Sequence, residues 1–326
     1  MEIEEYVISQ IVFLITTKCN LRCKLCYIKE KEPLDISFDT IKKAFETLPL
    51  LSLKELIISG GEPFLRPDLI FRLLDYIKRY KPNLKISIQS NGTLLDDSII
   101  KKLNNYNLNI GIGISIDGPI SINDSLRGKT SLVLDCLDRL SRYGNKIGIT
   151  ITISKYNYSN LSDLLMILAH FPCVRFIGLD PLRPIGNAKE KDIAPLEKTK
   201  QSLKEFKRTL YWINRKREES IIIKEGLNKP KKTSYCYAAN GSLLVIHPNG
   251  SFWPCPSLIN NKNFCLGNIK DGIKHMIKLN MLDTNCYKDK NNCPGRCPVR
   301  SWLSLKAGLI DCIIRKIFLD ISCNML

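Results

Sequence analysis

Short apolar runs alternate with longer amphipathic segments through the first half of the chain. Continuous β-branched and aliphatic residues predict strands, whereas apolar residues that recur every three or four positions predict helices. The expected strands are Ile11–Thr17, Glu55–Ser59, Lys85–Gln89, Asn109–Ile116, Lys146–Ile153 and Val174–Leu179. The expected helices are Asp39–Leu48, Pro67–Tyr80, Asp96–Leu103, Ser131–Tyr143 and Tyr158–His170. Six such β-then-α units predict an α/β fold in which helices cover the outer face of a parallel sheet.

Polar motifs lie at the carboxyl ends of four expected strands. Cys19 follows the first strand, Gly60 follows the second, Ser90 closes the third, and Ser115 with Asp117 closes the fourth. In parallel barrels the reactive groups gather in the loops after the strands, because those loops vary while the strands hold them in place. The motifs are therefore expected to meet at one rim of an open six-stranded barrel.

The alternation of strands and helices stops after Pro181. A charged stretch with roughly helical spacing follows, and from Tyr235 the composition changes to cysteine, proline, glycine and asparagine. We predict a barrel over residues 1–183, a charged helical connector over 184–234 and a small Cys-rich α+β domain over 235–326.

The composition favours a metal-binding protein of the cytosol. The chain has 13 cysteines, an odd number, and its first residues are acidic where a signal peptide would be basic. No apolar run approaches the ~20 residues needed to span a bilayer. In a reducing compartment, metal ligation accounts for the cysteines better than disulfides do. Cys136 and Cys173, which lie in apolar contexts, are expected to be buried packing residues instead.

The chain carries a surplus of positive charge. Lys and Arg number 49 against 32 Asp and Glu, a formal net charge of +17. Such a surplus suits nucleic acid, an anionic substrate or solubility alone. Much of it lies between Lys189 and Lys232, where charged residues alternate with apolar ones as on a solvated helix. Since no zinc-finger, RNP or helix-turn-helix pattern accompanies it, a nucleic-acid partner is disfavoured.

Three closely spaced cysteines, Cys19, Cys23 and Cys26, form a CxxxCxxC motif. Thiols this close in one short segment pair poorly with each other, and an iron–sulfur cluster that only carries electrons takes four thiolates. Three thiolates can hold three corners of a [4Fe-4S] cube and leave the fourth iron open for chemistry. Zinc or purely structural thiols are the alternatives.

Together with Gly60-Gly61-Glu62-Pro63 and Ser90-Asn91-Gly92, this motif resembles the radical S-adenosylmethionine (radical SAM) superfamily. The resemblance covers most of the chain and implies a partial (β/α)6 TIM barrel. It also implies that SAM binds the open iron of the cluster and is cleaved reductively to a 5′-deoxyadenosyl radical, which abstracts hydrogen from a substrate. A flavodoxin- or ferredoxin-type electron donor is then expected.

The same resemblance names residues for the SAM site. Gly60 and Gly61 allow the backbone to approach a ligand closely, and Pro63 fixes the exit turn. Arg127 is expected to clamp the SAM carboxylate or to neutralise an anionic substrate, and a surface salt bridge is its alternative role. The cofactor-binding residues implied are Leu25, Gly60, Gly61, Glu62, Pro63, Ser90, Asn91, Ser115, Asp117 and Arg127, and no catalytic side chain is assigned.

The C-terminal cysteines resemble the SPASM domain, a module that carries auxiliary clusters. Thirteen residues separate Cys236 from Gly250, and four separate Gly250 from Cys255. A hairpin between these cysteines, turning at Pro248-Asn249-Gly250, would bring them together. The second half is imperfect, because one cysteine of the usual pattern is missing. The resemblance assigns Cys236, Cys255 and Cys297 to a first cluster and Cys286, Cys293, Cys312 and the oxygen ligand Asp283 to a second.

Zinc or an empty second site is the alternative there. Relatives with this module mostly modify peptides or proteins, and some modify tetrapyrroles. Pro256 stands where the sulfatase-maturing branch has a proton-accepting Asp, which disfavours that activity. The sequence therefore predicts a radical SAM oxidoreductase acting on a peptide or protein, with a tetrapyrrole or other anionic small molecule as the second possibility. A non-catalytic iron–sulfur or nucleic-acid-binding protein is the alternative from another class.

Overall fold

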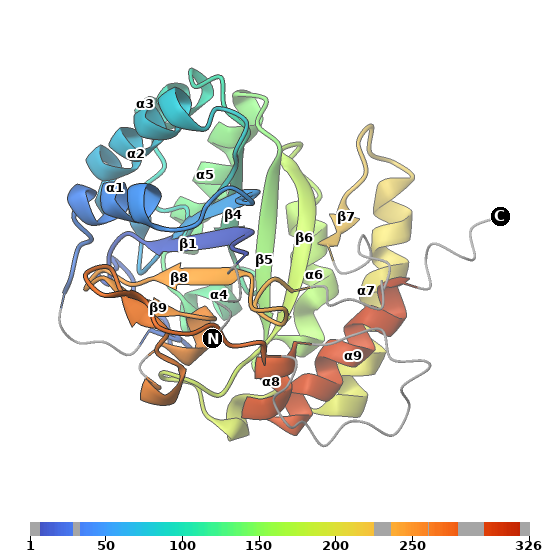
Figure 1. Ribbon diagram of the computed structural model, residues 1–326. Helices are drawn as coiled ribbons and strands as arrows, with labels where there is room; N and C mark the ends of the chain where they lie inside the picture. The colour runs from blue at the N-terminus through green and yellow to red at the C-terminus, as the bar shows by residue number, and fades with distance from the viewer. Residues whose placement is uncertain (1–6, 29–32, 225–235, 260, 280–296, 320–326) are drawn as a thin grey trace.

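A computed structural model describes residues 7–28, 33–224, 236–259, 261–279 and 297–319 (Figure 1). Six neighbouring parallel strands form its centre, in the order of the sequence. They are β1 (Gln10–Leu14), β2 (Glu55–Ser59), β3 (Lys85–Ser90), β4 (Ile110–Ser115), β5 (Ile147–Ile153) and β6 (Val174–Pro181). The expected α/β fold with a parallel six-stranded core is confirmed.

Helices follow the strands close to the expected positions. They are α1 (Phe38–Thr47), α2 (Pro67–Tyr80), α3 (Asp97–Asn104), α5 (Thr130–Arg142) and α6 (Leu161–Leu168). Ser37 and Asp96 cap α1 and α3, since their side chains accept the amides of Thr40 at 3.0 Å and Ile99 at 2.8 Å. The last helix is shorter than predicted, because a 3-10 turn, Tyr158–Asn160, precedes it. A short helix that the sequence did not predict, α4 (Ile120–Leu126), follows β4.

The connector contains one long helix, α7 (Leu196–Asn214). Its apolar stripe, which includes Leu203, Phe206 and Leu210, is buried, and Phe206 meets Phe318 of α9 edge to face at 6.0 Å. The helix therefore has the solvated charged face that its sequence predicts. After it, β7 (Ile222–Ile223) pairs with β6.

The C-terminal region continues the barrel sheet. Strand β8 (Leu243–Ile246) pairs in parallel with β1 and forms the expected hairpin with β9 (Ser251–Trp253). Two short strands, β10 (Gly267–Asn268) and β11 (Gly272–Ile273), extend the sheet to eleven strands among the described residues. An open barrel leaves the backbone of its first strand unpaired, and β8 covers that edge. One sheet thus runs across the expected boundary at residue 235, and the division into three parts stays a prediction.

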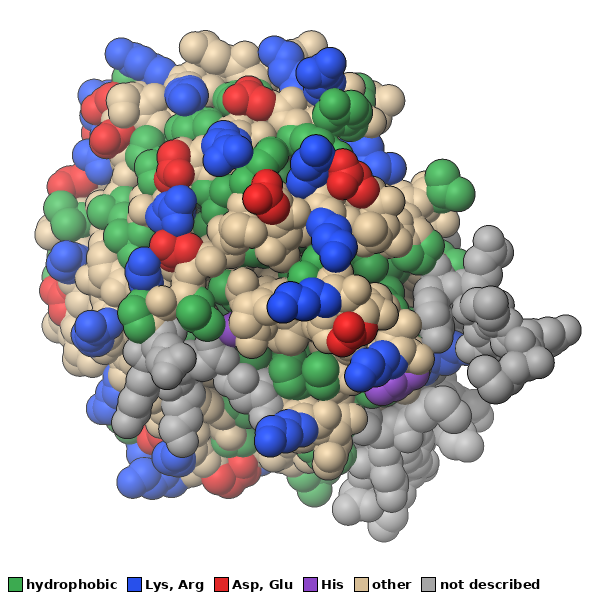
Figure 2. Space-filling view, turned by 60° about the vertical axis from the view of Figure 1, so that its left-hand side comes forward, with side chains coloured by type: hydrophobic (Ala, Val, Ile, Leu, Met, Phe, Trp, Pro, Cys, Tyr) green, Lys and Arg blue, Asp and Glu red, His purple; other side chains and the backbone are tan. Residues whose placement is uncertain are grey.

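Two helices complete the described C-terminal region, α8 (Pro298–Leu303) and α9 (Leu305–Leu319). Helix α9 packs against α7 (Figure 1). No helix in the described part of the chain is both long and apolar enough to cross a bilayer. On the face drawn in Figure 2, Lys and Arg side chains are interspersed with Asp and Glu rather than gathered in one patch. That arrangement gives no support to a nucleic-acid surface on this face.

Candidate active site

The CxxxCxxC cysteines lie in the loop that leaves the carboxyl end of β1. This loop contacts the opposite side of the barrel, where the amide of Lys24 donates to the carbonyl of Leu126 at 2.7 Å. Burial raises the pKa of Cys19, and it raises the pKa of Cys23 to about 11. A charge on Cys26 would raise both pKa values further, so the three sulfur atoms lie within electrostatic reach of one another.

The three thiols have the donor chemistry of an iron–sulfur cluster. Within the described ranges, no three His, Cys, Asp or Glu side chains are close enough together to hold one metal ion. A [4Fe-4S] cube takes its thiolates on different irons. Buried thiols with raised pKa values lose their protons when a cationic centre binds. The three residues therefore fit the implied cluster, and their ligand role stays a prediction.

The two glycines after β2 lie against the start of the cluster loop. The amide of Gly61 donates to the carbonyl of Thr16 at 2.7 Å, and a Cβ atom at Gly61 would collide with the carbonyl oxygen of Lys18. Only glycine permits this approach of the two backbones. The glycines thus place the end of β2 directly beside Cys19.

Glu62 connects this loop to the motif at the end of β3. Its side chain is fully buried; Oε1 accepts the Ser90 hydroxyl at 2.9 Å and the Phe64 amide at 3.1 Å, and Oε2 accepts the Asn91 amide at 2.7 Å. Burial raises the pKa of this carboxyl, against the opposing effect of the three hydrogen bonds. Glu62 therefore fixes the two predicted SAM loops relative to each other and does not line the cavity they surround.

Asn91 extends that connection to the cluster loop. Its Nδ2 donates to Asn20 Oδ1 at 2.9 Å and lies 3.9 Å from Cys19 Sγ, while its Oδ1 accepts the Thr93 hydroxyl at 2.7 Å. An amide donor beside a thiolate stabilises its charged form. The loops after β1, β2 and β3 thus form one hydrogen-bonded unit.

Arg127 is half-buried, and it pairs with the buried Asp117 rather than with surface carboxylates. Its Nε lies 2.5 Å from Asp117 Oδ2, and Asp117 Oδ1 accepts the Thr152 amide at 2.7 Å. The guanidinium charge lowers the pKa of Cys23, opposing the larger effect of burial. The surface salt bridge considered for Arg127 is wrong, since its side chain is only 18% exposed. The binding role expected of it stays a prediction.

These loops surround a cavity of about 660 Å³ at the carboxyl ends of the strands. The three cysteines line it, and so do eight of the ten residues predicted to bind SAM; Glu62 and Pro63 lie behind it. Its remaining walls include Thr150 and Thr152 of β5, Asp180 of β6 and Arg183, which the sequence patterns did not single out. The cavity has the size of a small-molecule site.

The cysteines assigned to the first auxiliary cluster are also brought together. Burial raises the pKa of Cys236, and it raises the pKa of Cys255 to about 12; a charge on Cys297 would raise both further, so the three thiols lie near one another. The hairpin of β8 and β9 accounts for the approach of Cys236 and Cys255, and Cys297 precedes α8. For the second cluster, Cys312 lies on α9, whereas Asp283, Cys286 and Cys293 lie outside the described residues. Cys136 and Cys173 are buried, as predicted.

A network of charges joins the cavity to these auxiliary cysteines. Asp180 contacts both Arg183 and Arg300, and Arg300 NH1 also pairs with Asp311 Oδ1 at 3.0 Å. Asp311 Oδ2 in turn accepts the Cys297 amide at 2.8 Å. Burial would raise the pKa of Asp180, but the two guanidinium groups hold it below its ordinary value.

A second cavity, of about 310 Å³, adjoins the first. Thr17, Tyr27 and Ile28 line both, and the second is otherwise walled by Leu14 of β1, Ile185, Gly186 and C-terminal residues. That C-terminal wall is mainly apolar and comprises His247, Pro256, Ser257, Leu258, Ile259, Asn261, Trp302 and Leu303. The two cavities therefore meet where the barrel faces the C-terminal region.

Comparison with characterised and uncharacterised relatives agrees with this geometry. The model of the Radical SAM superfamily matches residues 13–169. An uncharacterized protein of Methanocaldococcus jannaschii is 35% identical over 290 residues, which are 86% of this chain and 94% of that protein. The Fe-coproporphyrin III synthase of Methanosarcina barkeri is 30% identical over 48% of this chain and 40% of its own length.

Two further likenesses extend into the C-terminal region. The Bacillus subtilis protein AlbA, of antilisterial bacteriocin subtilosin biosynthesis, is 28% identical over 79% of this chain and 56% of its own length. The solved structure of anSMEcpe with bound AdoMet and the Cp18Cys peptide covers 97% of both chains with a TM-score of 0.73, at 22% identity. That likeness shows the fold alone. From the matched family model, the relatives and the strand-end motifs around one cavity, we conclude that this chain belongs to the radical SAM superfamily.

Proposed function

We propose that this enzyme cleaves SAM at a cluster held by Cys19, Cys23 and Cys26 and modifies a peptide or protein. The observation that carries the proposal is the single cavity that the three cysteines share with the loops after β2, β3 and β4. When bound there, a reduced [4Fe-4S] cluster supplies one electron to SAM, which yields methionine and a 5′-deoxyadenosyl radical that takes a hydrogen atom from the substrate. The chemistry belongs to the cofactors, and the chain supplies placement and exclusion of water.

The residues around the cavity have distinct tasks in this proposal. The backbone after β2 is free to approach the SAM amino group, because Gly60 and Gly61 carry no side chains. Ser115 offers a hydroxyl to the ribose or the carboxylate. The side chains of Ser90 and Asn91 are hydrogen-bonded to Glu62 and Asn20, so they hold the wall of the cavity in place. Arg127, held by Asp117, supplies fixed positive charge beside Cys23 and a partner for an anionic group.

A peptide substrate suits the adjoining cavity. Its apolar wall from Leu258, Ile259 and Trp302 can receive a hydrophobic side chain while the neighbouring residue of the peptide reaches the larger cavity. Relatives that mature peptides support the same interpretation. We place the enzyme in the cytosol, where its thiols stay reduced, with a flavodoxin- or ferredoxin-type protein as electron donor and auxiliary clusters to accept electrons.

A tetrapyrrole is the second candidate substrate. Arg22, Arg127 and Arg183 line the main cavity and could bind propionate groups, and part of the chain is similar to Fe-coproporphyrin III synthase. The reaction products distinguish the two candidate substrates.

Anaerobic reconstitution followed by dithionite and SAM tests the proposal. We expect 5′-deoxyadenosine from the wild type and none from Cys26→Ala, because two thiolates cannot keep the cluster with its open iron in place. Cys255→Ala is expected to retain part of this cleavage but to lose substrate turnover. Equal and total loss in both variants would show that the clusters are assigned wrongly.

The substrate class is tested by mass spectrometry of the same reactions. One arm receives peptides encoded next to the gene of this chain, and the other receives iron coproporphyrin. A mass change in a peptide supports the first proposal, whereas decarboxylation of the porphyrin with unchanged peptides supports the second. Absence of 5′-deoxyadenosine under every condition would contradict both.

A further inference from the structure

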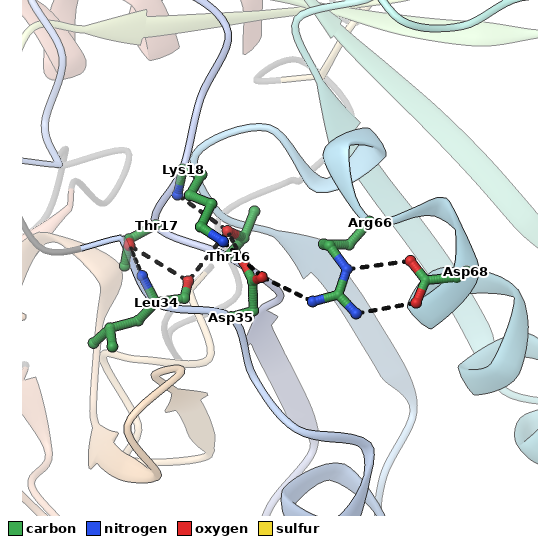
Figure 3. A network of polar contacts seen from close by, with 7 residues as sticks. All are labelled: Thr16, Thr17, Lys18, Leu34, Asp35, Arg66 and Asp68. Carbon is green, nitrogen blue, oxygen red and sulfur yellow. Dashed lines mark hydrogen bonds and ion pairs between the residues drawn. The ribbon is translucent and has the colours of Figure 1, made fainter.

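The loop that carries the three cysteines is closed at its base by paired backbones. It departs through Thr16, Thr17 and Lys18 and returns through Leu34 and Asp35, and these segments lie side by side (Figure 3). The Thr17 amide donates to the Leu34 carbonyl at 2.9 Å, and the Leu34 amide donates back to Thr17 Oγ1 at 2.8 Å. Cys19 directly follows Lys18, the last residue of the outgoing segment. Whatever fixes this base therefore also fixes the first predicted ligand.

Asp35 is the centre of the polar contacts at this base. Its Oδ1 accepts the hydroxyl of the fully buried Thr16 at 2.6 Å, and its Oδ2 lies 2.9 Å from Lys18 Nζ and 2.8 Å from Arg66 NH1 (Figure 3). The Asp35 side chain is only 21% exposed. One carboxylate thus joins the outgoing strand end, the returning segment and the residue just before α2.

Arg66 connects this contact to the predicted SAM loop. It follows the 3-10 turn Pro63–Leu65 that directly succeeds Gly60, Gly61 and Glu62. The Glu62 amide also donates to the Lys18 carbonyl at 2.9 Å. On its other side, Arg66 is held by Asp68 in a two-point contact, Nε to Oδ1 at 3.2 Å and NH2 to Oδ2 at 3.0 Å. The Asp68 side chain is 61% exposed, so it forms the outer edge of the network.

We propose that Asp35 is a positioning residue for the iron–sulfur cluster, acting by closing the base of the cysteine loop around Thr16, Lys18 and Arg66. A loop whose ends are held together has less conformational freedom to lose when three thiolates converge on one cluster. Isolated surface ion pairs contribute little, but this carboxylate is partly buried and accepts three donors from two other segments of the chain. The inference rests on the cluster ligands of the proposed function.

The experiment measures retention of the cluster. Wild type, Asp35→Ala, Asp35→Asn and Asp68→Ala are reconstituted anaerobically and assayed for iron and sulfide per chain, and then for the rate of iron loss to bathophenanthroline disulfonate. We expect Asp35→Ala to lose iron about tenfold faster, consistent with loss of charge-assisted hydrogen bonds. Asp68→Ala removes a carboxylate from the same network without touching Asp35, and it should stay within about twofold of wild type.

Two further readouts distinguish positioning from general destabilisation. In the metal-free state, Asp35→Ala and Asp68→Ala should have similar melting temperatures. Their rates of iron loss, in contrast, should differ several-fold. Asp35→Asn keeps an oxygen for the Thr16 hydroxyl but not the ionic contacts, so its rate should be intermediate, and high salt should speed iron loss from wild type more than from this variant. The SAM-induced change in the electron paramagnetic resonance signal of the loaded fraction should persist in all variants.

The outcomes separate this inference from the proposed function. If wild type binds no cluster, the proposed function fails. If wild type binds the cluster and both Asp35 variants release iron as slowly as Asp68→Ala, only the role of Asp35 is overturned. That role is also overturned if iron loss merely tracks the melting temperature, or if Asp35→Ala cannot be folded while Asp35→Asn behaves as wild type.

Discussion

At the scale of single residues, the buried carboxylate of Glu62 has the clearest physical role. It is fully buried and accepts three hydrogen bonds, two of them from the motif that follows β3. A glutamine there could keep one oxygen acceptor, but its NH2 group would face a backbone N–H. Two donors cannot form a hydrogen bond with each other. The sequence indicated that Glu62 belongs to a loop-forming motif, but it could not show which groups its oxygens accept.

We predict that Glu62→Gln lowers the free energy of unfolding by about 1–3 kcal/mol at pH 7, the cost of leaving buried donors without acceptors. Urea titration of the metal-free protein measures it. Glu46→Gln is the control, since Glu46 is half exposed on α1 and should change stability by less than about 0.5 kcal/mol. Equal effects of the two substitutions would contradict the role of Glu62.

The stability difference between wild type and Glu62→Gln should also depend on pH. Because burial raises the pKa of Glu62, the folded chain binds this proton more tightly than the unfolded chain, whose carboxyl titrates near 4.5. The stabilisation of the fold by Glu62 is therefore fully present below pH 4.5. It falls as the pH rises from there through the raised pKa of the folded chain. The advantage of wild type over the variant should narrow over that window in urea titrations, and an advantage that widens would contradict the shift.

At the scale of elements, the segment after β6 supports the cluster loop from the connector side. Gly186 has a φ of +63°, and a Cβ atom there would lie 2.6 Å from the Tyr27 carbonyl oxygen and closer still to that of Cys26. The neighbouring Asn187 amide donates to the Cys26 carbonyl at 2.9 Å. An alanine at 186 would therefore push against the backbone of the third predicted ligand.

We expect Gly186→Ala to reduce cluster loading as well as stability. Gly144, in the turn before β5, has a similar φ of +68° with no atom within 4 Å of its Cβ position, so Gly144→Ala imposes the backbone strain alone. That strain costs roughly 1 kcal/mol. Iron content and melting temperature of the two variants measure the difference. If both variants retain iron equally, the contact between Gly186 and the cluster loop does not affect cluster loading.

Most elements of the barrel were predictable from the sequence because local signals agree with the tertiary fold. The strand Glu55–Ser59 and the helix Pro67–Tyr80 have the expected bounds, since apolar periodicity and Pro67 both mark them. Helix α4 was missed because a seven-residue helix gives too short a pattern to recognise. Thr150 and Thr152 were missed because they are ordinary polar positions of β5. They line the cavity only because the sheet curves, and their local sequence does not indicate that curvature.

At the scale of the whole molecule, the sequence could not predict how the C-terminal region joins the barrel. The pairing of β8 with the edge of β1 links segments more than half the chain apart, and no local pattern specifies it. The same holds for Asp180 and Arg300, which are 120 residues apart and yet share one partly buried ionic contact. Cysteine spacing indicated the auxiliary ligands, but it carried no information about the charges that connect them to the cavity.

That ionic network should be the principal polar link between the two regions. The Arg300 side chain is 7% exposed and that of Asp311 is 2% exposed, and removing one member of a buried pair leaves an uncompensated charge. We predict that Arg300→Met costs about 3 kcal/mol in the free energy of unfolding. Arg142→Met, which removes a pair with Asp138 that is more than half exposed on both sides, should cost less than about 0.5 kcal/mol.

Coupling between the two regions can then be measured by a double-mutant cycle. Asp180→Asn combined with Arg300→Met should cost less than the sum of the two single substitutions, because each removes the same contact. Denaturant unfolding gives the free energies, and iodoacetamide labelling of Cys255 reports whether the auxiliary site has opened. The raised pKa of Cys255, about 12, keeps labelling slow at neutral pH while that thiol stays buried, so faster labelling in Arg300→Met signals loosening beside Cys297. Additive free energies together with unchanged labelling would mean that Arg300 does not couple the cavity to the auxiliary cysteines.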